Sequence, residues 1–419
     1  MATSLFDRDG LKDFVAAGEG APPPVFVGRK KAIEDIEAAA RRAWKPGAAS
    51  HGEPKATRIL YGAPGAGKSS ILAELESWSL EASARVPRVL AVSSERLVSD
   101  LPSVFTAMSA AGAMKSDEWF KWAGGMRREW TRRAGRVLER LFAVGFAGFS
   151  LGLARSGAEP QDNLFALASA TPASKWIAPV IVAVDEAQNL PAGKSTPTTL
   201  FLQLIHNASS ELPLTLVLTG LGDTRHLAQE IGLTRALNLH EVGCLAAAEV
   251  EDLVRGFCKR FGIQAYGCED QLADFAADGE GWPRHLHCAM QALGEEALAT
   301  DGDLNSIGWS RAAKRAAESR LRFYRAQQSE EMKACERLVA AVMRDLRDGT
   351  SWSDIVGLIE EHADDEPGYR LPESTTSEMF RRRLVRQGAL HEGADGRFRS
   401  PIPSFRSFLF EEGKQGRMN

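Results

Sequence analysis

Short apolar runs and longer amphipathic stretches alternate along the first half of the chain. The apolar runs occupy residues 58–61, 89–92, 180–184 and 214–218. They are too short for helices and have the composition of buried strands. Because helical patterns separate them, the sequence predicts a parallel sheet covered by helices on both faces, which is an α/β fold.

From residue 246 onward the pattern is wholly helical. Apolar positions recur at helical spacing, and Gly or Asp-Gly closes the first three segments. The predicted helices span residues 246–261, 269–277, 284–298, 311–326, 330–346, 352–361 and 377–387. Residues 389–392 then turn through a glycine-rich segment into residues 397–400, as in a hairpin. Three helices followed by a hairpin is the element order of a winged helix.

A glycine-rich segment directly follows the first apolar run and fits the pattern G-x-x-x-x-G-K-[ST]. Its residues are Gly62, Ala63, Pro64, Gly65, Ala66, Gly67, Lys68 and Ser69. Such a loop turns successive backbone N–H groups inward around phosphates, and the helix that follows directs its positive end at them. Lys68 would reach the β- and γ-phosphates, the Ser69 hydroxyl would ligate Mg²⁺, and Ser70 lies in the same helix start. We expect ATP and Mg²⁺ to bind here.

Two carboxylates follow the apolar run at residues 180–184. This places Asp185 and Glu186 at the carboxyl end of a strand, where ligands bind in open α/β sheets. Asp185 would hold Mg²⁺, and Glu186 would orient and deprotonate the attacking water. Gln188 and Asn189 either contact the γ-phosphate or simply form the loop. This pair predicts a Mg²⁺-dependent ATPase.

Several motifs together resemble the AAA+ ATPases of the origin-recognition (replication initiator) group. They lie at residues 26–29, 62–69, 180–188, 218–220 and 281–284. The chain is similar to the bacterial origin-recognition-like ATPases and to related signalling and transposition-associated ATPases. The resemblance extends from residue 26 to residue 298, and a terminal winged helix is also typical of the group. It implies a P-loop NTPase (AAA+) sheet core, a small helical lid and a C-terminal winged-helix domain.

The resemblance also implies roles for further residues. Gly28 and Arg29 match the segment that lies near adenine in such proteins. Thr219 matches the sensor 1 residue, although the common Asn is lacking and Asp223 competes for the role. Arg284 matches sensor 2, a lid arginine that reaches the γ-phosphate and couples it to lid closure.

An arginine finger is implied between the sensor strand and the next strand. Arg235 matches it and would act on the ATP of a neighbouring copy, so that hydrolysis would require a homo-oligomer. A solvated arginine at a helix end is an equal alternative for Arg235. Arg225 is a second candidate for the finger.

The length of 419 residues exceeds one ordinary hydrophobic core and predicts several domains. We expect a nucleotide-binding core at residues 1–246 with an insertion at about 112–176, a lid at 247–300 and a winged-helix-like domain at 301–419. Aromatic and cationic residues interleave at 119–133 in the insertion. They could grip nucleic acid or an anionic surface. We favour a charged helix face packed on the core.

Composition indicates the class of protein and its cellular compartment. Apolar residues at 44% and charged residues at 25% are typical of a soluble globular protein. The five cysteines form no CxxC pair and are expected to be reduced thiols. The longest apolar run, residues 141–154, is short of the roughly 20 residues that span a bilayer. With no export signal at the amino terminus, we expect a cytoplasmic protein without a membrane partner.

The net charge of −4 gives no global reason to bind nucleic acid, so a local basic patch must do so. Arginines cluster on the predicted helix that would enter a major groove: Arg381, Arg382, Arg383 and Arg386. We therefore favour an ATP-hydrolysing switch that couples nucleotide state to binding of double-stranded DNA or to self-assembly. The alternative is a signalling ATPase with slow turnover whose winged helix docks a protein partner without DNA.

Overall fold

The computed structural model describes most of the chain. The described residues are 6–17, 23–43, 57–81, 87–113, 178–191, 196–208, 213–233, 237–328, 335–365, 371, 375–393 and 395–415. Residues 119–133, most of the expected insertion at 112–176, and Arg235 lie outside these ranges.

A five-stranded parallel sheet forms the centre of the first lobe. Its strands are β1 (Thr57–Tyr61), β2 (Arg88–Ser93), β3 (Val180–Asp185), β4 (Leu214–Gly220) and β5 (Leu237–Glu241). Their order across the sheet is β2-β3-β4-β1-β5, and every pair is parallel. The four predicted strands and the predicted α/β fold are confirmed. The carboxyl ends of β1, β3 and β4 therefore meet at one edge of the sheet.

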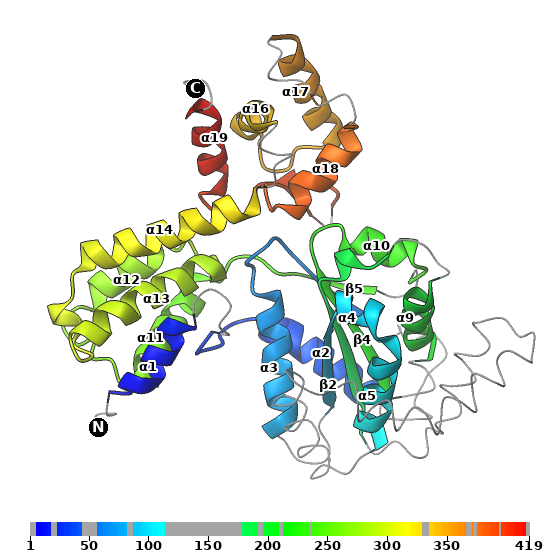
Figure 1. Cartoon of the computed structure of the whole chain (residues 1–419), viewed down its shortest axis with the longest axis horizontal. Coiled ribbons are helices and arrows are strands. Elements are labelled where there is room, and N and C mark those ends of the chain that lie inside the picture. Colours follow the sequence, from blue (N-terminus) through cyan, green and yellow to red (C-terminus); the bar gives the residue numbers. More distant parts are fainter. Residues whose placement is uncertain are drawn as a thin grey trace, which may run out of the picture.

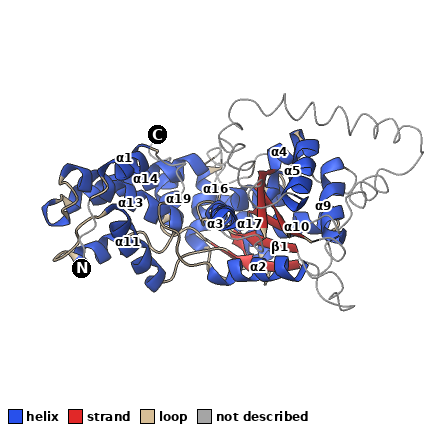
Figure 2. Ribbon diagram, turned by 90° about the horizontal axis from the view of Figure 1, so that it is seen from below, coloured by secondary structure: helices blue, strands red, loops and turns tan. Residues whose placement is uncertain are grey.

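Helices cover both faces of this sheet (Figure 2). Because successive strand residues point to opposite faces, Leu60 packs with the helices of one face and Ile59 with those of the other. The first face carries α2 (Lys30–Ala43) and α3 (Lys68–Glu81). The second carries α4 (Ser94–Ser99), α5 (Leu101–Ala113), α9 (Pro197–Ala208) and α10 (Thr224–Glu230). This is a three-layer α/β/α arrangement.

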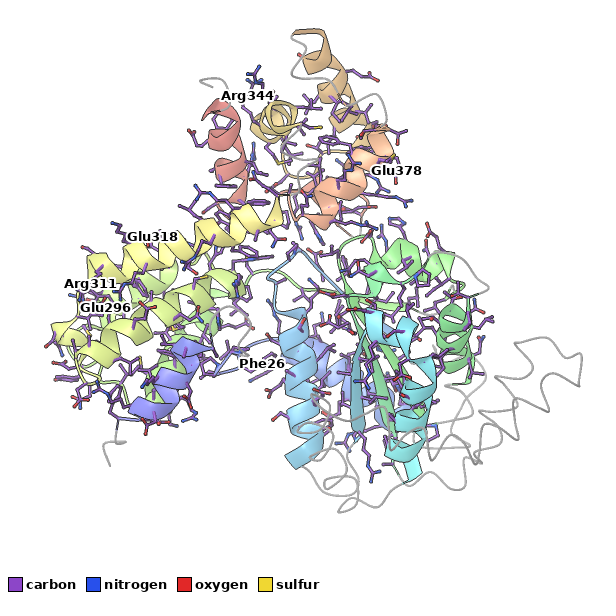
Figure 3. All side chains as sticks on the ribbon, viewed as in Figure 1. Phe26, Glu296, Arg311, Glu318, Arg344 and Glu378 are labelled. Atoms are coloured by element: carbon purple, nitrogen blue, oxygen red, sulfur yellow. The ribbon has the colours of Figure 1, made fainter. Side chains whose placement is uncertain are left out.

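A helical lobe follows, which we call the lid (Figure 1). It contains α11 (Ala247–Phe261), α12 (Glu269–Ala277), α13 (Pro283–Ala299), the short η4 (Leu304–Ser306) and the first part of α14 (Trp309–Gln327). The amino-terminal helix α1 (Arg8–Ala16), which we did not predict, packs Phe14 on Phe257 with ring centroids 5.7 Å apart. Figure 3 labels Glu296 of α13 and Arg311 of α14, which are joined by an Nε–Oε1 hydrogen bond of 2.6 Å.

The last lobe, which we call the C-terminal domain, contains the helices and hairpin in the predicted order. They are α16 (Glu336–Asp345), α17 (Trp352–Asp365), α18 (Ser377–Arg386), β6 (His391–Glu392) and β7 (Phe398–Arg399). A further helix, α19 (Phe405–Gln415), packs on α16. The Thr376 hydroxyl caps α18 by accepting a hydrogen bond of 3.2 Å from the Met379 N–H. The winged-helix assignment and the domain boundaries stay predictions.

Two sequence expectations concern the whole chain. All five cysteines are free thiols. No helix in the described ranges has the length and apolar character needed to cross a bilayer.

Candidate nucleotide-binding site

The glycine-rich loop, Gly62 to Gly67, connects strand β1, which lies between β4 and β5, to the first turn of α3. Gly65 and Gly67 have φ values of +79° and +90°, which favour glycine. A Cβ on Gly62 would lie 2.1 Å from the Val242 carbonyl oxygen, so this position excludes side chains for a different reason. The loop thus follows the strand closely and leads the amino end of α3 to the carboxyl edge of the sheet.

Lys68 lies inside this loop. Its Nζ donates hydrogen bonds to the carbonyl oxygens of Gly62, at 2.8 Å, and Ala63, at 2.9 Å. Burial lowers the pKa of Lys68 to about 8, and the nearby carboxylates of Asp185 and Glu186 act in the opposite direction. A partly buried ammonium group that is bonded to carbonyl oxygens is well suited to an anionic ligand.

The carboxylate of Asp185 joins three elements at the sheet edge. It accepts a hydrogen bond of 2.6 Å from the Ser69 hydroxyl at the start of α3. It also accepts one from the Thr219 hydroxyl near the end of β4. Hydroxyl and carboxylate oxygens are the ligands that Mg²⁺ prefers, so Ser69 and Asp185 fit a Mg²⁺ ion that a phosphate also binds. The geometry favours Thr219 over Asp223 as the polar residue beside the acid.

Glu186 has left-handed backbone angles, φ 53° and ψ 41°. Such angles cost free energy for a residue with a side chain and are concentrated at functional sites. The short helix η3 (Ala187–Asn189) follows, and the Asn189 side-chain amide donates to the Glu186 carboxylate at 3.4 Å. Gln188 accepts a hydrogen bond of 3.2 Å from the Leu221 N–H, which ties η3 to the loop after β4.

The lid meets the phosphate loop at the start of α13. The Arg284 N–H donates to the Gly65 carbonyl oxygen at 3.1 Å. The Arg284 guanidinium lies over the Phe323 ring, 5.6 Å from its centroid. Pro283 occupies the first turn of α13, where the lost N–H costs no hydrogen bond. Arg284 therefore comes from the lid but lies at the loop.

An apolar pocket adjoins the loop between the first lobe and the lid. Phe26 belongs to the segment between α1 and α2, and Figure 3 shows it beside α3 on the side that faces the lid helices. The main pocket walls are Phe26, Val27, Leu245, Pro283 and His287, and Gly67 and Ser70 form the edge next to the loop. Apolar walls next to a phosphate-binding loop can hold a flat heterocyclic base.

Arg29 fixes one side of this pocket. Its guanidinium donates to the carbonyl oxygens of Ala66, at 3.2 Å, and Gly243. Burial lowers the pKa of Arg29. Gly28 does not line the pocket. Its φ is +71°, and a Cβ there would lie 2.4 Å from a carboxylate oxygen of Glu249.

We compared the sequence and the structure with those of known proteins. No protein-family model matches the sequence, and no curated protein matches it either. Among solved structures, the Aeropyrum pernix ORC2 protein, solved as ADPNP-ADP complexes, is similar with a TM-score of 0.54 and 14% sequence identity. The match covers 99% of this chain and 100% of that chain.

The chain has the fold of the AAA+ origin-recognition proteins. Two further solved structures are similar at lower scores. The Aeropyrum pernix ORC1 protein in complex with DNA has a TM-score of 0.42 and 16% identity over 97% of this chain and 98% of that one. Cdc6p from Pyrobaculum aerophilum has a TM-score of 0.41 and 14% identity over 99% of this chain and 100% of that one.

The sequence did not predict that the C-terminal domain contacts the first lobe beside the phosphate loop. The ring of His391 in β6 stacks on the ring of Tyr61, the residue before the phosphate loop, with centroids 5.6 Å apart. Arg225, the second candidate for an arginine finger, donates to Glu392 at 3.0 Å, and its side chain is only 18% exposed. No local sequence signal marks these contacts because they join segments more than 150 residues apart.

Proposed function

We propose that this protein binds ATP with Mg²⁺ and hydrolyses the ATP, and that its nucleotide state acts as a switch. The observation that supports this most directly is the Asp185 carboxylate, which accepts hydrogen bonds from the hydroxyls of Ser69 and Thr219 beside the partly buried Lys68. The ADPNP-ADP complexes named for the similar ORC2 protein agree with an adenine nucleotide in a site of this fold.

Each residue then has a separate task. The loop N–H groups and Lys68 bind the phosphates, while the apolar pocket at Phe26 holds adenine. Ser69 and Asp185 hold Mg²⁺, which neutralises phosphate charge when bound. Glu186 accepts a proton from the attacking water, and Thr219 keeps Asp185 in place. Arg284 binds the γ-phosphate, so that the position of the lid depends on whether this phosphate is present.

The switch is proposed to control DNA binding or self-assembly. Arg382 and Arg386 on α18 are exposed and can approach phosphates of double-stranded DNA. Arg235 is proposed to act on the ATP of a neighbouring copy, which would make hydrolysis depend on assembly.

A second candidate function has a specific observation in its favour. Arg381 of α18 bonds Glu378 and Glu392 within its own domain, so this cation already has anionic partners. That favours a signalling ATPase with slow turnover that uses its C-terminal domain to dock a protein partner. ATPase activity stimulated by duplex DNA, with a steep salt dependence, supports the first function. Unchanged turnover supports the second.

Calorimetric titration with MgATP tests the nucleotide site. Lys68→Met should weaken binding by roughly ten- to a hundredfold, since it removes charge-assisted hydrogen bonds. Lys30→Met is the matched control, because Lys30 is an exposed lysine at the start of α2. If folded wild-type protein has no affinity for adenine nucleotides, the proposed function is wrong.

A further inference from the structure

The C-terminal domain rests directly on the phosphate loop. A Cβ built on Gly388, just after α18, would lie 2.8 Å from Cδ of Pro64 in the loop. The His391 ring in β6 covers Tyr61 at the end of β1. Figure 1 shows α18 next to α10, on the side of the first lobe that carries the loop. The domain therefore touches the same short segment that binds phosphates.

Helix α18 is covered on two sides. Phe380 and Leu384, four residues apart, are buried in the core of the C-terminal domain. Val385 is buried as well, and its Cγ1 would be 3.5 Å from a Cβ on Gly222 in the loop after β4. Arg382 and Arg386 are exposed. Their charges act on the carboxyl group of Asp223, which lies next to Gly222.

A buried carboxylate connects this helix to the first lobe. Glu392 of β6 has a side chain that is 9% exposed. It accepts hydrogen bonds from Arg381 of α18 at 2.9 Å and from Arg225 of α10 at 3.0 Å. A ring nitrogen of His226 lies 3.1 Å away. Loss of this buried charge would leave the facing cations without their shared anion, which weakens the contact.

We propose that α18 binds either the first lobe or duplex DNA, never both at once, and that Glu392 holds the lobe-bound arrangement. This inference rests on the DNA-binding part of the proposed function. A helix with its side chains is about 10–12 Å wide and fills a major groove of about 12 Å. Val385 and Gly222 lie at van der Waals distance from each other, so a duplex cannot enter between α18 and the first lobe. Arg381 also donates hydrogen bonds to Glu378 and Glu392, so DNA phosphates must compete with these carboxylates for its guanidinium group.

The nucleotide site takes part in this exchange. Gly388 and His391 follow α18 in the same domain and contact Pro64 and Tyr61, so they leave the first lobe together with α18. DNA binding therefore uncovers the phosphate loop, and a ligand that displaces Pro64 or Tyr61 favours release of α18. The two ligands are linked through one surface.

A reversible covalent lock tests the exclusion. Cysteines at Gly222→Cys and Val385→Cys lie close enough for a disulfide in the lobe-bound arrangement. They are introduced together in a Cys244→Ser background, because Cys244 is the exposed native thiol. Fluorescence anisotropy with a labelled duplex should give binding at least about tenfold weaker for the oxidised protein than for the same protein after reduction. Each single substitution, treated alike, should show no such dependence.

Three results overturn the proposal. One is equal DNA affinity of the locked and reduced proteins, and another is failure of the two thiols to pair in folded protein. The third is an absence of DNA binding by the reduced and wild-type proteins at low salt, which also removes the DNA-binding part of the proposed function. MgATP titration of the same samples separates that outcome from loss of the nucleotide site.

A second variant tests Glu392 itself. Glu392→Gln should bind the duplex several-fold more tightly than wild type, because it weakens the contact that competes with DNA. Glu360→Gln is the control, since it removes one negative charge from an exposed position on α17. Equal affinities of the two variants for DNA would show that Glu392 does not hold the lobe-bound arrangement.

Discussion

The backbone N–H of Arg284 donates a hydrogen bond of 3.1 Å to the carbonyl oxygen of Gly65. This contact joins the first turn of lid helix α13 to the middle of the phosphate loop. A change in the path of the loop must therefore move the lid or break the bond. The lid and the candidate nucleotide site are in direct contact at this point.

Gly65→Ala should lower MgATP affinity by at least about tenfold. The new Cβ would lie 2.7 Å from the Arg284 Cβ, and the φ of +79° is unfavourable for alanine, so the loop must change shape. Gly243→Ala is the control, because nothing lies within 4 Å of its added Cβ. Isothermal titration of both variants makes the comparison. Unchanged affinity in Gly65→Ala would contradict a tight loop geometry.

Glu186→Gln should bind MgATP as wild type does and hydrolyse it about 10²- to 10⁴-fold more slowly, because the general base is lost. The left-handed backbone cost is similar for Glu and Gln, so thermal stability should change little. Glu230→Gln, at an exposed position at the end of α10, should keep wild-type turnover. Phosphate release at saturating ATP measures the difference. Full activity in Glu186→Gln would remove Glu186 from the mechanism.

Thr219→Val should slow hydrolysis by roughly tenfold with a smaller change in MgATP affinity, because Asp185 loses a hydrogen bond that positions it. Thr215→Val is a matched control in the same strand. The Thr215 hydroxyl is buried and has no hydrogen-bond partner within the described structure, so its removal should leave turnover unchanged. Similar rates for both variants would mean that Thr219 is only a core residue.

Stability should fall as the pH drops below neutrality, and His285 should account for part of the loss. Burial, with help from the Arg320 and Arg284 charges, lowers the pKa of His285 from 6.5 to about 4. The unfolded chain therefore binds a proton before the folded one does. Stability from this group is present above pH 6.5 and is lost as the pH falls toward 4, by about 2 kcal/mol between pH 7 and pH 5.

Urea unfolding of wild type and His285→Gln at pH 7 and pH 5 measures this contribution. The variant loses the hydrogen bond to the Tyr324 hydroxyl and starts less stable, but its free energy of unfolding should depend less on pH. His391, whose pKa burial also lowers to about 4, remains in both proteins and gives a common background. An equal pH dependence of both proteins would contradict a neutral buried His285.

The geometry of the candidate nucleotide site could be predicted from sequence because the motifs that form it are local. The spacing from Gly62 to Ser69 determines the loop, and the apolar run before Asp185 determines where that carboxylate lies. Thr219 meets Asp185 because β3 and β4 are neighbouring parallel strands that end at the same edge. In each case a strand pattern and a short motif were sufficient.

The docking of the C-terminal domain could not be predicted in this way. Glu392 and Arg225 are 167 residues apart, and neither belongs to a recognisable motif. The arginines of α18 suggested a surface for DNA, whereas Arg381 lies against carboxylates of its own chain. Such contacts depend on how whole lobes pack, and a single sequence contains no periodic signal for that.

Helix α14 connects the lid to the C-terminal domain over a long distance. It spans 19 residues, which is about 28 Å along its axis. Glu296 holds its first turn through Arg311, and near its far end the Tyr324 hydroxyl donates to the Pro403 carbonyl oxygen at 3.0 Å. A tilt of about 10° at the start of such a rod shifts its tip by about 5 Å. A rigid helix of this length would therefore convert an ångström-scale rearrangement at the lid into a larger displacement of the C-terminal domain.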